Sequence, residues 1–100
     1  MGLHTLSTSP FGGSALQHCR SAVSPGDALL LYADGVYAAL RNSAAAPLVQ
    51  ELQKSMSVYA IEEDCLARGI QGQLLDAIHL CDYRAFVELT VAHDKTIAWF

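Results

Sequence analysis

The stretch ALLLYADGVYAAL, residues 28–40, contains the only unbroken apolar run of this sequence that ends in a sharp turn signal. Residues 28–33 predict a strand buried on both faces, because a strand with one face in water alternates apolar and polar residues. Asp34-Gly35 ends that strand. The pair can close a hairpin, but the Ala-rich VYAAL after it favours a helix with Asp34 as its N-cap. Strand, turn and helix together form the repeating unit of an α/β sandwich.

The rest of the chain repeats this unit. Strands are predicted at 3–6, 57–61, 77–81 and 96–100, and helices at 14–23, around Pro47, at 62–69 and after Asp82. Asp82 is expected to cap the last helix. That helix has the best amphipathic pattern in the sequence, which predicts an inward-facing stripe of Tyr83, Phe86, Val87, Thr90 and Val91.

These elements predict one α/β domain over residues 1–100, a flavodoxin-like three-layer sandwich with a mainly parallel five-stranded sheet. A flavodoxin-like strand order of 2-1-3-4-5 with right-handed crossovers is the provisional expectation. Reactive groups in such sheets lie outside the carboxyl ends of the strands. In this chain that edge carries the loop STSPFGGS (7–14), Asp34-Gly35, residues 62–64 and Asp82-Tyr83.

Composition narrows the classes of function. The net charge is −4 and the six basic residues are scattered, which argues against direct nucleic-acid binding, and no apolar run is long enough to span a membrane. Only 16% of residues are charged whereas 52% are hydrophobic, so part of the apolar surface is expected to face a partner subunit. Three widely spaced cysteines fit a reduced, cytoplasmic protein without disulfides. No metal site is predicted, because the histidines have no partner at metal-ligand spacing; they are His4, His18, His79 and His93. No cofactor is predicted either.

Cys19 has the most chemical promise, because it lies in the first helix just behind the 7–14 loop, between His18 and Arg20. Cationic neighbours and a helix N-terminus favour a thiolate, although Cys19 also fits the apolar stripe of that helix as packing. Cys65 and Cys81 are expected to be buried filler. The 7–14 loop resembles an anion-binding loop only weakly, so a phosphate or flavin binder is the least favoured alternative.

Four blocks of the sequence resemble, in the right order, the DsrH/TusB family of intracellular sulfur-relay proteins. They are LHTL (3–6) with SPF (9–11), LLLYADGVYAAL (29–40), VYAIEEDCLARG (58–69) and CDYRAFVELTVAHDKTIAW (81–99). The resemblance implies a DsrEFH-like fold and a cytoplasmic subunit beside DsrE/TusD-like and DsrF/TusC-like sisters in a heterohexamer. That complex passes persulfide sulfur to a DsrC/TusE-type carrier, for sulfur oxidation or for 2-thiouridine at the tRNA wobble position.

The resemblance also bears on Cys19, because DsrH-type members carry a cysteine at this place in the first helix. It implies that Cys19 is a candidate persulfide carrier and the chain a candidate sulfurtransferase component. The alternative is a structural subunit of the same complex in which Cys19 is packing, since the principal sulfur-binding cysteine of the family belongs to the DsrE/TusD partner. In isolation the chain could instead form a homo-oligomer.

Overall fold

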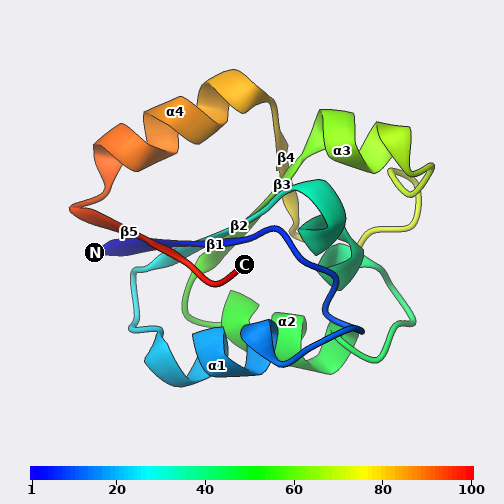
Figure 1. The fold of residues 1–100 in the computed structure, drawn as a ribbon, viewed down its shortest axis with the longest axis horizontal. Coiled ribbons are helices and arrows are strands. Elements are labelled where there is room, and N and C mark those ends of the chain that lie inside the picture. The colour runs from blue at the N-terminus through cyan, green and yellow to red at the C-terminus, as the bar shows by residue number, and fades with distance from the viewer.

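The computed structural model describes residues 1–100 and confirms the α/β fold. Five strands form one sheet: β1 (Gly2–Leu6), β2 (Ala28–Leu31), β3 (Ser57–Ile61), β4 (His79–Cys81) and β5 (Lys95–Ala98). The helices are α1 (Ala15–Ala22), the 3₁₀ helix η1 (Ala33–Ala39), α2 (Ala46–Gln53), α3 (Glu62–Ala67) and α4 (Tyr83–Ala92). Helices α1 and α2 lie on one side of the sheet, and α3 and α4 on the other, which makes the predicted three layers (Figure 1). No helix combines the length and the apolar composition that crossing a bilayer requires.

The sheet is parallel throughout, but its strand order differs from the predicted 2-1-3-4-5. The observed order is β4-β3-β2-β1-β5, so the chain adds three strands in one direction before it returns to pair β5 with β1. Both orders use the same right-handed crossovers, so handedness does not separate them. The deciding factor is the face on which each connection packs. Helices α1 and α2 share one face and α4 returns across the other, whereas the order 2-1-3-4-5 would require α1 and α2 on opposite faces. Residues 70–75 also run on the α2 side, where Leu75 N–H donates to Ala39 O at 2.8 Å.

The two faces of the sheet are covered unequally. Leu29 and Leu31 of β2 point into a core cluster of 18 buried residues that includes residues of α1 and α2. Ala28 and Leu30 point the other way, into a cluster of only four buried residues, against which Phe86 and Leu89 of α4 pack. All four residues of β2 are buried, as predicted for a strand covered on both faces.

Several local predictions are confirmed. Pro47 lies in the first turn of α2, where its missing N–H costs no hydrogen bond. Asp82 caps α4, since its carboxylate accepts a hydrogen bond from Ala85 N at 2.9 Å. Gly69 follows α3 with a φ of +68°, the left-handed conformation that glycine adopts without strain.

The prediction that Asp34 is an N-cap is wrong. Tyr32 occupies the cap position of η1, Asp34 lies within its first turn, and the Asp34 carboxylate accepts hydrogen bonds from Arg68 instead. Gly35 has a different role from the turn that the Asp-Gly pair suggested. A Cβ atom at Gly35 would overlap the carbonyl oxygen of Leu6, so the absence of a side chain lets η1 pack directly on the end of β1.

The buried face of α4 is also not the predicted one. Phe86 and Leu89 face the sheet, whereas Tyr83, Val87 and Val91 are exposed, the last by 81%. The apolar arc of α4 is wider than the narrow sheet beneath it, and one side of the arc therefore remains uncovered. The predicted strand at 96–100 is shifted as well, since β5 spans Lys95–Ala98 and only the Trp99 N–H continues its pairing with β1.

Replacing Gly35 by Ala should destabilise the fold by about 3 kcal/mol, because the new methyl group must push the backbone of η1 away from Leu6. Urea unfolding followed by circular dichroism measures the loss. Gly72→Ala is the matched control, since a Cβ atom there meets nothing within 4 Å. Equal unfolding midpoints for the two variants would contradict the role assigned to Gly35.

Candidate functional site

Cys19, the predicted sulfur carrier, lies near the middle of α1 with its side chain enclosed in the core. Its exposed fraction is 0%, and it belongs to the same core cluster as Leu16 and Leu29. Burial, followed by the negative charge of Asp27, raises the pKa of the Cys19 thiol to about 12. At pH 8 a thiol with that pKa is ionised in about one molecule in ten thousand. In this fold Cys19 is thus a protonated thiol without access to solvent.

The other two cysteines are free thiols that resemble Cys19 in their environment. Cys65 is buried, and burial, followed by the charge of Asp64, raises its pKa to about 11. Cys81 is half-buried, and burial is again the main cause of its raised pKa. No three His, Cys, Asp or Glu side chains gather closely enough to hold a metal ion.

Asp27 lies next to α1, at the start of β2, and its carboxylate is buried among N–H donors. Gly2 N–H donates to Oδ1 at 2.9 Å, and His4 Nε2 and Ser24 N–H reach Oδ2 at 2.8 and 3.0 Å. Burial by itself would raise the pKa of Asp27. The hydrogen bonds from Gly2, His4 and Ser24 outweigh it and hold that pKa well below the usual carboxyl range. Asp27 is therefore an ionised group inside the protein.

His4, in the middle of β1, is completely buried and uses both ring nitrogens. Trp99 Nε1 lies 3.0 Å from His4 Nδ1, and an indole N–H can only donate, so Nδ1 accepts. Nε2 must then carry the proton that it donates to Asp27, and His4 is the neutral Nε2–H tautomer. The rings of His4 and Trp99 are nearly parallel, with an interplanar angle of 20°. With both nitrogens engaged, His4 is not available as a base for Cys19.

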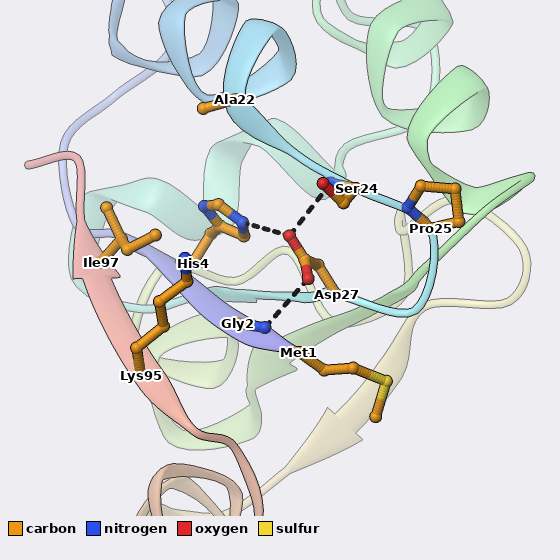
Figure 2. Close-up of a pocket in the computed structure, with 9 residues that line it drawn as sticks. All are labelled: Met1, Gly2, His4, Ala22, Ser24, Pro25, Asp27, Lys95 and Ile97. Atoms are coloured by element: carbon orange, nitrogen blue, oxygen red, sulfur yellow. Dashed lines mark hydrogen bonds and ion pairs between the residues drawn. The ribbon is translucent and has the colours of Figure 1, made fainter.

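A cavity of about 250 Å³ lies beside this group at the amino ends of β1, β2 and β5. Figure 2 shows the Asp27 carboxylate between Ser24, Gly2 and the imidazole of His4, with the side chains of Lys95 and Ile97 on the other side of the imidazole. The cavity is at the opposite edge of the sheet from the one predicted to hold reactive groups. The cavity borders the His4–Asp27 pair, of which only the Asp27 side chain, 10% exposed, contacts solvent.

The carboxyl edge has a second cavity, of about 320 Å³, where β1 and β5 are neighbours. Its walls are the 7–14 loop together with Trp99 and Phe100. The hydroxyls of the loop are partly engaged, since Thr8 donates to Phe100 O and Ser9 Oγ accepts from Phe11 N at 3.2 Å. The chain reverses direction across the sheet at this point, and ligands of open α/β sheets usually bind at such a reversal.

Two acidic residues of the carboxyl edge, Asp34 and Asp64, are paired within the chain. Asp34 Oδ1 accepts from Arg68 Nε at 3.1 Å and from Nη2 at 2.9 Å. Asp64 Oδ2 accepts from the Tyr83 hydroxyl at 2.7 Å and from Ala33 N at 2.8 Å. The hydrogen bond to Asp64 is the main reason why the pKa of Tyr83 rises to about 12. These bonds connect η1, α3 and α4 and give Asp34 and Asp64 a structural role, whereas Glu62 and Glu63 are exposed.

The sequence did not reveal the His4–Asp27–Trp99 group. Its members lie at positions 4, 27 and 99, which form no recognisable spacing, and nothing in the sequence singles out Asp27. Their association depends on β1 lying between β2 and β5, which the predicted strand order did not provide.

Comparison with known proteins places the chain in a family. Residues 8–96 match the family described as DsrH like protein. The chain is 40% identical to Protein TusB of Yersinia pestis (strain Pestoides F) over 97 residues, which are 97% of this chain and 99% of the relative. Protein TusB of Yersinia pseudotuberculosis serotype O:1b (strain IP 31758) is similar to the same extent.

Solved structures agree on the fold. The ychN protein of E. coli superposes with a TM-score of 0.79 at 17% identity, and the match covers 98% of each chain. A protein of unknown function from Methanobacterium thermoautotrophicum gives a TM-score of 0.77 at 17% identity, over 97% of this chain and 96% of that protein. At these identities the structures support the fold alone.

Replacing Asp27 by Asn should cost about 2–3 kcal/mol at pH 7, because an amide has one acceptor oxygen and leaves one of the three N–H donors facing its NH₂ group. The depressed pKa makes the Asp27 contribution complete above the ordinary carboxyl pKa and progressively lost as the pH falls below it. Urea unfolding should therefore show the largest difference between the proteins near neutrality, and a smaller one below about pH 4.

Asp76→Asn is the matched control, since it removes the same charge from an exposed position. A constant difference between wild type and Asp27→Asn from pH 7 to about pH 3 would contradict the buried, ionised state of Asp27.

Proposed function

This chain belongs to the DsrH family, and we propose that it acts in the cytoplasm as a subunit of a sulfur-relay complex. Its partners in this proposal are DsrE/TusD-like and DsrF/TusC-like sisters in a heterohexamer, with a DsrC/TusE-like protein as the sulfur acceptor. The observation that carries the proposal is the 40% identity to TusB proteins over nearly the whole of both chains.

The uncovered side of α4 supports the assembly part of the proposal. Tyr83, Val87 and Val91 are spaced four residues apart along the helix, and their exposed fractions are 46%, 62% and 81%. Leu80 on the neighbouring edge strand β4 is 41% exposed as well. Side chains of this kind gain free energy when a partner covers them. A sister subunit on α4 would also add to the thin core on this face of the sheet.

Sulfur relay proceeds by thiol–persulfide exchange. A thiolate attacks the outer sulfur of a donor persulfide, the donor S–S bond breaks, and the donor leaves as a thiolate while a new persulfide forms on the acceptor. The attacking group must be ionised and within reach of the donor. Cys19 as the carrier remains a prediction, and its burial and raised pKa favour the structural alternative. A carrier role would require α1 to move away from the sheet.

The proposal covers two destinations for the sulfur, which are sulfur oxidation and the synthesis of wobble 2-thiouridine. The flavodoxin-like phosphate or flavin binder ranks last. The 7–14 loop, which would have to hold the phosphate, lies against Trp99 and Phe100, and its Thr8 hydroxyl already donates to Phe100 O.

If this subunit is structural, exposing the assembled complex to a persulfide donor should place sulfur on a sister subunit and none on this chain. Intact-mass measurement detects a reducible gain of one sulfur atom on each subunit. Cys19→Ala should then leave transfer to the acceptor unchanged, as should the matched control Cys65→Ala. A sulfur gain on this chain that disappears in Cys19→Ala and persists in Cys65→Ala would instead identify Cys19 as the carrier.

Replacing Val91 by Glu should weaken association with the sister subunits roughly 100-fold, because about 3 kcal/mol is lost when a charge replaces a covered valine. The fold should not change, since Val91 is largely exposed in the single chain. Co-purification from a strain expressing all three subunits measures association. Gln50→Glu, an exposed position on α2, is the control. Normal assembly of Val91→Glu would exclude this side of α4 from the interface.

A further inference from the structure

We propose that His4 is a proton-controlled latch that holds the indole of Trp99 against β1 and thereby closes one wall of the carboxyl-edge cavity. The inference rests on the contacts of the chain itself and is independent of the sulfur-relay role. It uses the one buried histidine of the protein, for which the proposed function has no use.

Two hydrogen bonds hold Trp99 in place. Its backbone N–H donates to Thr5 O at 2.9 Å, which continues the pairing of β5 with β1 by one residue. Its indole N–H donates to His4 Nδ1 at 3.0 Å, and this is the one hydrogen bond of the Trp99 side chain. Trp99 also packs against the main core cluster, so the His4 contact is the polar part of what holds the indole. That polar contact depends on an unprotonated Nδ1, whereas the backbone hydrogen bond does not.

Protonation of His4 removes this hydrogen bond selectively. Nε2 already carries a proton, which it donates to Asp27, so an added proton must go to Nδ1. Nδ1 then becomes a donor that faces another donor, the indole N–H, while the hydrogen bond to Asp27 persists as an ion pair.

The charged groups beside His4 act on a protonated imidazole in opposite directions. Asp27, at the start of β2, is ionised and attracts a positive charge, and Lys95 of β5, which lines the same cavity, opposes it. Cys19 of α1 is protonated and neutral. The 250 Å³ cavity borders both His4 and Asp27, and the Asp27 side chain, which is 10% exposed, is the member of the pair that contacts solvent.

Release of the indole alters the opposite edge of the sheet. Trp99 lines the cavity of about 320 Å³ between the 7–14 loop and Phe100, so its departure enlarges that cavity. The backbone hydrogen bond to Thr5 keeps β5 in the sheet. The device therefore couples a proton in the middle of β1 to the shape of the carboxyl edge.

Trp99 is the only tryptophan, so its fluorescence reports this event directly. Between about pH 8 and pH 5, emission of the wild-type chain should move to longer wavelength and acrylamide quenching should increase in one single-proton transition. Far-UV circular dichroism should stay constant over the same range. His4→Gln removes the titrating ring and should abolish the transition, whereas His18→Gln at an exposed position of α1 should retain it. Constant fluorescence in the wild type, or the same transition in His4→Gln, would overturn the proposal.

A second measurement uses the wild type alone, in case His4→Gln does not fold. The single indole N–H gives one ¹H–¹⁵N resonance. At pH 8 it should be protected from exchange with water, and the ¹⁵N shifts of His4 should identify the Nε2–H tautomer. On acidification the indole resonance should move and its exchange should accelerate together with protonation of His4. An indole resonance that remains protected while His4 titrates would reject the latch.

Discussion

The buried carboxylate of Asp27 is the constraint on which the centre of this structure depends. An ionised group inside a protein is tolerated only when its hydrogen-bonding capacity is filled, and here N–H groups from Gly2, Ser24 and His4 fill it. Those donors come from the start of β1, its middle, and the turn before β2. By accepting from all three, one side chain ties β1 to the turn before β2 and favours the Nε2–H tautomer of His4. The same negative charge contributes to keeping Cys19 protonated, so it opposes a reactive role for that thiol.

The sequence predicted the fold class because its signals are local. The continuous apolar run at 28–31, Pro47 at the start of α2 and the Asp82 cap each depend on residues within one or two turns of chain. Strand order is not a local property. It depends on which face of the sheet each connection covers, and both candidate orders satisfy the rule of right-handed crossovers. The prediction of 2-1-3-4-5 therefore had no residue to rest on, and it was wrong.

The candidate site was harder to predict for the same reason. Cys19 was singled out from its neighbours in sequence, His18 and Arg20, but both are exposed on α1 whereas the thiol points into the core. His4 and Trp99 were not connected at all, since their contact requires β5 to lie beside β1. Helix periodicity likewise identified the apolar arc of α4 but not which half of it the sheet covers. What the sequence left undetermined was thus the identity of neighbours across the sheet.

The pairing of β1 with β5 has a consequence for folding during synthesis on the ribosome. β1 is made first and gains β2 as its neighbour early, but its other edge stays open until residues 95–98 have emerged. Pairing across more than ninety residues is slow, because the entropy of closing so long a loop is lost before the contact forms. Throughout synthesis, β1, with its apolar side chains Leu3 and Leu6, has one unpaired edge that other chains can reach. The last strand therefore also closes the one edge of β1 that could pair with another chain.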